Sequence, residues 1–174
     1  MKADDRSAFV EFASARSVAL HRYAYLLVGD QQLAEDLLQE SLTKTYVAMP
    51  RLRDPHRLEA YTRKTITRTA ISWWRRKGWS AEKPRDDVPE VQNHGHDDQV
   101  VDRAFVWSEL QTLPARQRAA IVLRFYEDCT FADIAEAMHC AEGTAKSQVS
   151  RGLARLRERL GPDFRPVNPE VRAS

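Results

Sequence analysis

The sequence predicts an all-α fold of two small helical domains joined by a flexible linker, with a helix-turn-helix in the C-terminal domain. Apolar residues recur at the three- and four-residue intervals of amphipathic helices on both sides of the middle of the chain. Between them, residues 79–98 are rich in Pro, Asp, Glu and His and almost lack apolar spacing, which is typical of a linker. We expect domains at residues 1–78 and 99–161, and a disordered tail at 162–174 that contains three prolines.

The first helical segment, Ser7–Gly29, has apolar side chains at spacings that suit one or two amphipathic helices. Gly29 can end this segment, because glycine adopts the left-handed backbone of a helix C-terminus without strain. Asp30 then offers an N-cap to a second helix, which we expect to run to about Met49, where Pro50 stops it.

The second helix has an apolar side and a polar side. The residues expected to point inward are Ala34, Leu38, Leu42, Thr45 and Met49. The opposite side carries Asp36, Gln39, Glu40 and Thr43. A polar helix face is ordinarily just solvated, so the period alone assigns this face no partner.

A loop with two prolines, Pro50–Arg57, separates the second helix from a third that we expect at Leu58–Lys77. The predicted inward face of the third helix consists of Thr62, Ile66, Thr69 and Trp73. A narrow basic stripe lies opposite and comprises Arg57, Lys64, Arg68 and Arg75. Trp74 borders this stripe, where its ring could stack an unpaired nucleic-acid base for about 1–3 kcal/mol. The alternative is that Trp74 packs against the preceding helices.

The linker contains the run HGHDD, His94–Asp98, whose side chains are of the metal-ligand type. A metal site also needs rigid support and further ligands, and the surrounding sequence supplies neither. A metal hydrolase built on these residues is therefore a weak hypothesis, because no pair of nucleophile and base accompanies them. We expect a solvated spacer, no metal, no cofactor and no enzymatic activity.

The C-terminal domain opens with a helical face that includes Val101, Ala104, Phe105 and Ser108. A helix then runs to Tyr126 and begins with Pro114, because the first helical turn is where a missing N–H costs least. Two cysteines, Cys129 and Cys140, have no export signal around them. We expect them to be reduced and at least partly buried, with a redox switch as the alternative.

The stretch Thr130–Leu160 predicts two helices joined by a tight turn. In the first helix, Thr130 can cap the N-terminus and Asp133 adds a favourable carboxylate to the first turn. The inward residues of this helix are Phe131, Ile134, Ala135 and Met138. The second helix begins near Ala141 and has an apolar stripe of Val149, Leu153, Leu156 and Leu160. Gly143 is expected to let the two helices approach closely.

The second helix of such a motif fits the major groove of DNA, with its first two turns nearest the base edges. The candidates for DNA contact on it are Thr144, Lys146, Ser147, Ser150, Arg151 and Arg155. The alternative is an Arg-rich solvated helix. The formal net charge is only +2, so DNA binding must rest on local clusters of basic residues. No apolar run approaches the ~18 residues of a membrane span, which favours a cytoplasmic protein.

Two runs of the sequence resemble one protein family. The run Leu113–Leu160, LPARQRAAIVLRFYEDCTFADIAEAMHCAEGTAKSQVSRGLARLRERL, resembles the C-terminal DNA-binding domain of bacterial sigma factors of the extracytoplasmic-function group. The run Ala34–Met49, AEDLLQESLTKTYVAM, resembles the polymerase-binding helix of the N-terminal sigma domain. The two motifs occur in the order of the family, so the resemblance is more specific than a helix-turn-helix alone.

The resemblance implies a promoter-recognition subunit whose partners are promoter DNA and core RNA polymerase. The implied docking sites on the polymerase are the clamp of its largest subunit and the flap of its second-largest subunit. An anti-sigma factor is a further partner in the habit of the family. The implied polymerase contacts are Asp36, Gln39, Glu40 and Thr43. The implied contacts with the -10 element are Arg53, His56, Arg57, Lys64, Arg68, Trp74, Arg75 and Arg76. The implied contacts with the -35 element are the six candidates of the helix-turn-helix, with Lys146, Ser147 and Arg151 in the key positions.

The chain departs from the family pattern at several positions. Tyr61 and Arg68 stand where many relatives have tryptophan and asparagine, and His139 stands where many have glycine. The alternative function is a stand-alone helix-turn-helix regulator, which accounts for the C-terminal domain. A regulator leaves the acidic face of the second helix and the basic third helix without a role. In vitro transcription with core polymerase discriminates between a sigma factor and a stand-alone regulator.

Overall fold

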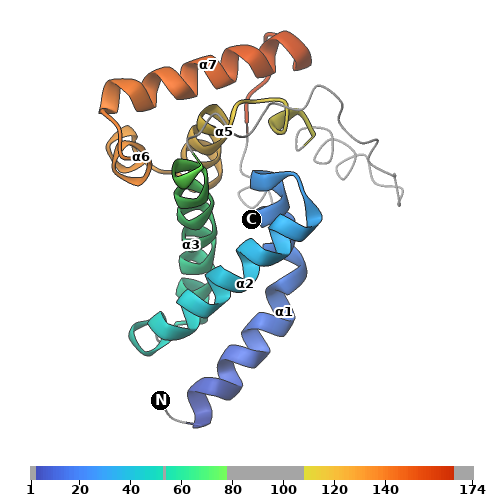
Figure 1. Ribbon diagram of the computed structural model, residues 1–174, viewed down its shortest axis with the longest axis vertical. Helices are drawn as coiled ribbons and strands as arrows, with labels where there is room; N and C mark the ends of the chain where they lie inside the picture. The colour runs from blue at the N-terminus through green and yellow to red at the C-terminus, as the bar shows by residue number, and fades with distance from the viewer. Residues whose placement is uncertain (1–2, 53, 78–107, 167–174) are drawn as a thin grey trace. The chain divides into compact units, whose positions relative to one another are not determined.

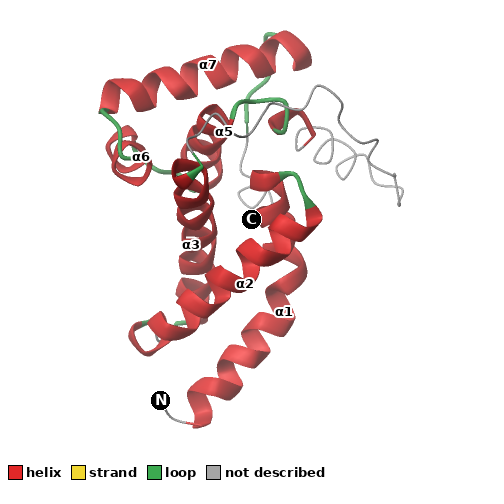
Figure 2. Ribbon diagram, in the orientation of Figure 1, coloured by secondary structure: helices red, strands yellow, loops and turns green. Residues whose placement is uncertain are grey.

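The computed structural model describes residues 3–52, 54–77 and 108–166, and these residues form helices and short connections without a strand among them (Figures 1 and 2). The prediction of an all-α fold is confirmed. The chain divides into two compact units, Met1–Trp73 and Trp74–Ser174, which we call the first and the second unit. The predicted linker with its HGHDD run, the helical face at residues 101–105 and residues 167–174 of the tail lie outside the described residues.

The first unit begins with α1, Ala3–Val28, which is one continuous helix. It ends at Gly29, whose φ of 65° lies in the left-handed region and whose backbone N–H bonds to the carbonyl of Tyr25 at 2.8 Å. Gly29 therefore closes the helix as predicted. Leu20 and Leu27 of α1 are fully buried and contribute to the core of the first unit.

The second helix, α2, spans Gln31–Ala48. Asp30 has an extended backbone, and its carboxylate accepts the N–H of Leu33 at 2.9 Å, so the predicted N-cap is confirmed. The buried residues of α2 are Ala34, Leu37, Leu38, Ser41 and Thr45. A short 3-10 turn that contains Pro50, η1, Met49–Arg51, follows α2.

The third helix, α3, spans Pro55–Arg76 and begins three residues before the predicted start at Leu58. Pro55 is predicted to lie in the loop, because the stretch Pro50–Arg57 has two prolines and no regular period. Proline is well suited to the first helical position, however, since an N–H there has no helical partner. The helix therefore includes Pro55, and the predicted loop is shorter than expected.

Two buried flanks attach α3 to the other helices of the first unit. On one flank, Tyr23 Oη of α1 lies 2.7 Å from Thr67 Oγ1. On the other flank, Thr45 Oγ1 of α2 lies 3.2 Å from Thr62 Oγ1. The buried hydroxyl groups on both flanks therefore have hydrogen-bond partners.

In the second unit, α5, Ala115–Ile121, follows Pro114 as its N-cap residue and continues into a short π-helical turn, η2, Val122–Tyr126. The helix predicted to run to Tyr126 is thus present, with a wider last turn. Ala119, Ala120 and Ile121 are fully buried. These small and branched side chains form the surface against which the last helix of the unit packs.

Arg118 of α5 is a buried charge, with only 1% of its surface exposed. Its Nε donates to the carbonyl of Leu110 at 3.2 Å, and its Nη2 donates to the carbonyl of Leu113 at 3.0 Å. The guanidinium therefore binds carbonyl groups of the helical turn that precedes α5. Such hydrogen bonds offset part of the cost of removing the charge from water.

The first helix of the predicted helix-turn-helix is α6, Phe131–Met138. Thr130 and Asp133 form a capping box, in which the Thr130 side chain accepts the backbone N–H of Asp133 at 3.1 Å and the Thr130 N–H bonds to the Asp133 carboxylate at 2.9 Å. The predicted cap is confirmed. The helix ends at His139, which has a left-handed backbone with φ 51° and ψ 52°.

The second helix of the motif is α7, Glu142–Leu160, which follows Ala141 as predicted. The role expected of Gly143 is wrong, because Gly143 is exposed and a Cβ built on it would meet nothing within 4 Å. The glycine at a close helix approach is Gly152, where a Cβ would meet Ile121 Cγ1 of α5 at 2.9 Å. The buried residues of α7 are Ala145, Val149, Gly152 and Leu156, which share one face of the helix.

Candidate functional site

The polar side of α2 is open to solvent. Asp36, Gln39 and Thr43 are exposed, and the side chain of Glu40 keeps 38% of its accessible surface. Asp36 accepts a hydrogen bond from Gln32 Nε2 at 3.3 Å, and the Thr43 hydroxyl donates to the carbonyl of Gln39 at 2.9 Å. We call Asp36, Gln39, Glu40 and Thr43 the α2 patch. One helix thus presents all four side chains on one accessible surface.

Two exposed apolar side chains lie at the ends of the α2 patch. Leu33 is 37% exposed and Val47 is 75% exposed. Positions 33, 36, 40, 43 and 47 follow one another at steps of three and four residues, so they form one stripe along the helix. Leu33 and Val47 are absent from the predicted site, because a lone apolar residue on a polar face breaks the period. Their register with Asp36 and Glu40 is the signal that would have found them.

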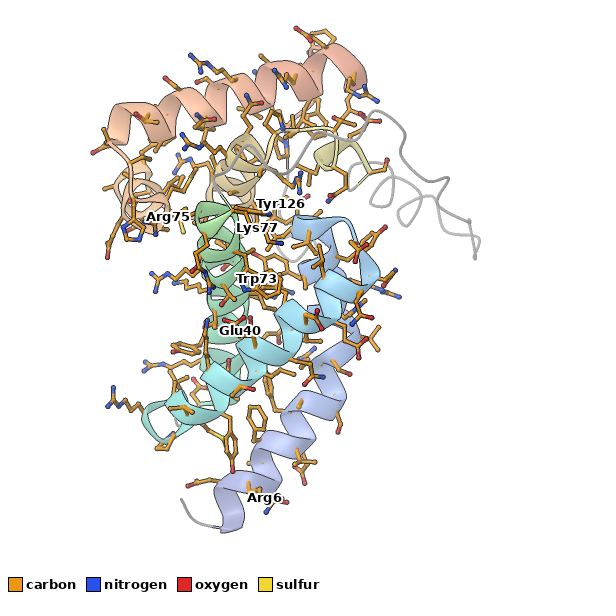
Figure 3. The ribbon with its side chains drawn as sticks, in the orientation of Figure 1. Arg6, Glu40, Trp73, Arg75, Lys77 and Tyr126 are labelled. Atoms are coloured by element: carbon orange, nitrogen blue, oxygen red, sulfur yellow. The ribbon has the colours of Figure 1, made fainter. Side chains whose placement is uncertain are left out.

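Glu40 is held by side chains of both α2 and α3 (Figure 3). Lys44 Nζ lies 2.7 Å from Glu40 Oε1, and Trp73 Nε1 donates to Glu40 Oε2 at 2.9 Å. Lys44 Nζ also donates to Thr69 Oγ1 of α3 at 3.0 Å. The carboxylate therefore has a defined position at the border between the two helices.

The basic stripe predicted on α3 is exposed to solvent. Its members Arg57, Lys64, Arg68 and Arg75 all lie on the open side of the helix, and Arg76 is exposed as well. Three of the four residues predicted to face inward, Thr62, Ile66 and Thr69, are buried. Arg53 and the side chain of His56 lie outside the described residues.

The two tryptophans of α3 differ from expectation. Trp74 is only 6% exposed, so the expectation that its ring faces the basic stripe is wrong. It continues a buried row with Thr67, Ala70 and Ile71, at steps of three and four residues. The buried arc of α3 is therefore wider than predicted. Trp73, expected in the core, is half-buried and binds Glu40 instead.

The outer face of α7 carries every residue predicted to contact the -35 element. Thr144, Lys146, Ser147, Ser150, Arg151 and Arg155 are all exposed. The opposite face packs on α5 and α6 through Ala145, Val149 and Leu156. The helix is therefore anchored by its apolar side and presents three basic and three hydroxyl-bearing side chains to solvent.

Phe131 of α6 lies between two cations. Arg124 Cζ is 4.6 Å and Lys146 Nζ is 5.6 Å from the centroid of its ring, both within the range of cation–π attraction. Arg124 Nη1 also donates to the carbonyl of Cys129 at 2.9 Å. The ring thereby steadies Lys146 at the start of the exposed face of α7.

Neither a metal site nor a membrane-spanning helix occurs in the described residues. Within them, no group of three or more His, Cys, Asp or Glu side chains is placed to hold a metal ion. Among the helices the model describes, none combines the length and the apolar content that spanning a bilayer requires. Cys129 and Cys140 are half-buried, as expected.

The fold and these surfaces define a class of protein. A helix-turn-helix whose second helix exposes basic and hydroxyl side chains is a DNA-binding element. It is attached to a separate unit of three helices with a polar patch on α2 and a basic stripe on α3. The molecule is therefore a DNA-binding protein with a second, distinct interaction unit.

Comparison with known proteins identifies the family. The family model "Sigma-70 region 2" matches residues 14–80, and the model "Sigma-70, region 4" matches residues 106–156. RNA polymerase sigma-E factor of Streptomyces coelicolor is 37% identical over 152 residues, which are 87% of this chain and 85% of that protein. The ECF RNA polymerase sigma factor SigM of Mycobacterium tuberculosis is 30% identical over 159 residues, which are 91% of this chain and 80% of that protein.

A solved structure is also similar. It is the sigma factor RpoE of Bartonella quintana, in a crystal with the anti-sigma factor NepR, and it aligns with a TM-score of 0.56 and 25% sequence identity. The alignment covers 90% of this chain and 99% of the Bartonella chain. The chain belongs to the extracytoplasmic-function group of the sigma-70 family. Its function is that of a sigma factor, which binds core RNA polymerase and directs transcription initiation at promoters.

Proposed function

We propose that three exposed surfaces divide the work of promoter-specific initiation: the α2 patch binds core polymerase, the basic stripe of α3 binds the -10 element, and the outer face of α7 binds the -35 element. The observation that carries this proposal is that each surface is accessible while the apolar side of the same helix is buried. The first domain would comprise residues 1–78 and the second residues 99–161, joined by the linker 79–98.

Polymerase binding rests on the chemistry of the α2 patch. Its carboxylates, Asp36 and Glu40, can accept charge-assisted hydrogen bonds from the arginines of a basic partner helix. The family resemblance indicates the coiled coil of the clamp of the largest subunit as that partner. Leu33 and Val47 extend the contact, because exposed apolar side chains in line with the patch would be desolvated by the same helix.

Recognition of the -35 element rests on α7. Its first three turns carry Lys146, Ser147 and Arg151, whose side chains can reach base edges in the major groove. Arg155 lies one turn further along, where it can reach a phosphate. The flap of the second-largest polymerase subunit is the second docking site that we propose for this domain.

Recognition of the -10 element rests on Arg57, Lys64, Arg68, Arg75 and Arg76, together with Arg53 and His56. These cations would follow the phosphates of a displaced strand. Melting would follow when extruded bases bind the protein more favourably than the base stack. The chain would carry out no covalent chemistry and would act in the cytoplasm, together with the polymerase.

The test is in vitro transcription with core polymerase and a promoter from the same genome, such as the one upstream of its own gene. The double variant Asp36→Lys and Glu40→Lys should lose polymerase association while keeping its helical content. The double variant Lys146→Ala and Arg151→Ala should keep polymerase association but lose promoter binding. A chain that binds duplex DNA alone and supports no initiation would instead be a stand-alone regulator.

We also propose that an anti-sigma factor holds the chain inactive. The supporting observation is that the similar RpoE of Bartonella quintana is crystallised with the anti-sigma factor NepR. The experiment is a pull-down from the host, with mass spectrometry of the proteins that copurify. Recovery of polymerase subunits alone, in cells where the chain is inactive, would contradict this proposal.

A further inference from the structure

Glu40 is unusual in the α2 patch because a residue of another helix holds it. Its Oε2 accepts the indole N–H of Trp73 at 2.9 Å, and its Oε1 lies 2.7 Å from Lys44 Nζ. Lys44 Nζ is itself 3.0 Å from Thr69 Oγ1, so both groups that hold the carboxylate are tied to α3. The side chain of Glu40 nevertheless keeps 38% of its accessible surface, so a partner can reach it.

Packing alone does not require this contact. Trp73 is half-buried, and an indole N–H near the surface can donate to water. The helices α2 and α3 are already joined by the contact of Thr45 with Thr62. The hydrogen bond from Trp73 is therefore better explained by what it does to Glu40 than by what it adds to the core.

The effect on Glu40 is preorganisation. A glutamate on an exposed helix face samples several rotamers and loses that freedom when a partner binds it. A carboxylate already fixed by two donors loses less on binding, which strengthens the complex without any new contact. Trp73 and Lys44 thus fix the position of the Glu40 carboxylate before a cationic partner binds it.

We propose that Trp73 is a positioning residue for polymerase binding, which acts through Glu40. Trp73 belongs to α3, the helix proposed to bind the -10 element. It thus positions a carboxylate of α2 that is proposed to bind polymerase. This inference rests on the proposed role of Glu40, and the experiments below separate the two.

The first experiment tests the contact in the full chain. The indole N–H signal of Trp73, assigned by triple-resonance NMR, should shift by several tenths of a ppm in the proton dimension when Glu40→Ala removes its acceptor. Asp36→Ala is the matched control, since it removes another carboxylate of the α2 patch that does not touch Trp73, and it should leave the signal in place. An unchanged signal in Glu40→Ala overturns the inference.

The second experiment is a double-mutant cycle on the affinity for core polymerase. Trp73→Phe removes the N–H but keeps an aromatic ring, and it should weaken binding by about three- to tenfold, the cost of ordering one freed side chain on binding. In a Glu40→Ala background the same change should have no further effect, because the residue through which it acts is gone. Equal effects in both backgrounds mean a purely structural role and overturn the inference.

Controls separate the inference from the proposed function. If Glu40→Ala does not weaken polymerase binding, the proposed role of Glu40 fails and the inference fails with it. If Glu40→Ala weakens binding and Trp73→Phe does not, only the inference fails. Tyr25→Phe, which removes a polar group from another half-buried aromatic residue of the first unit, should leave the affinity unchanged. Should Trp73→Phe fold poorly, an unchanged NMR signal in Glu40→Ala still overturns the inference.

Discussion

Gly152 of α7 lies against Ile121 of α5 so closely that a Cβ added to the glycine would meet Ile121 Cγ1 at 2.9 Å and Cδ1 at 3.3 Å. Any side chain at position 152 must push α7 away from α5 or force Ile121 out of its rotamer. We expect Gly152→Val to lower the free energy of unfolding by about 1–3 kcal/mol, as measured by urea denaturation followed by circular dichroism.

The matched control is Gly143→Val, in the same helix. A Cβ at position 143 meets nothing within 4 Å, so the same substitution should change the free energy of unfolding by less than about 0.5 kcal/mol. Equal losses for the two variants would show that Gly152 is not at a close approach.

His139 holds the turn between α6 and α7 in a left-handed conformation, with φ 51°. This conformation costs a residue with a Cβ on the order of 1 kcal/mol, and glycine adopts it without that cost. His139→Gly should therefore raise the free energy of unfolding by up to about 1 kcal/mol. His139→Ala removes the imidazole but keeps the Cβ, so it should bring no gain, and a gain equal to that of glycine would refute this explanation.

Val47 is the most exposed of the large apolar side chains in the described residues, at 75%, and it lies in line with the α2 patch. Desolvation of part of this side chain by polymerase would contribute about 1 kcal/mol. Val47→Ser should thus weaken the affinity for core polymerase about fivefold in a fluorescence-anisotropy titration. Val18→Ser on α1, where the valine is 65% exposed, is the control and should bind normally.

Arg151 is exposed on the outer face of α7. If it neutralises a DNA phosphate or contacts a base edge close to one, its loss should reduce the slope of log affinity against log salt by up to about 0.9. The measurement is binding of holoenzyme to promoter DNA at a series of salt concentrations, with Arg151→Ala. Arg165→Ala removes an equal charge beyond the end of α7 and should leave the slope unchanged. The same slope for Arg151→Ala as for the unmodified chain would remove Arg151 from the interface.

Local signals in the sequence predict the helices well. The cap at Asp30, the stop at Gly29 and the capping box of Thr130 with Asp133 all depend on residues within one turn of each other, and all are present. The exposed faces of α2 and α7 are also correct, because each of these helices has one apolar side and one polar side.

The predictions that proved wrong concern contacts between helices. The period of α3 predicts one inward face, but Trp74 is buried as well, in a row with Thr67, Ala70 and Ile71. The glycine needed for close packing is Gly152, not Gly143, because only the position of α5 determines which glycine it meets. The link from Trp73 to Glu40 joins residues 33 positions apart and has no periodic signal at all.

The burial of Arg118 has a practical consequence for dissecting the molecule. Two carbonyl acceptors of its guanidinium, on Leu110 and Leu113, precede the first full helix of the C-terminal half. A fragment that began at Pro114 would lack both acceptors, and the buried guanidinium of Arg118 would lose these two hydrogen bonds. Any isolated fragment of the second unit must therefore include Leu110 and Leu113 if Arg118 is to keep these acceptors.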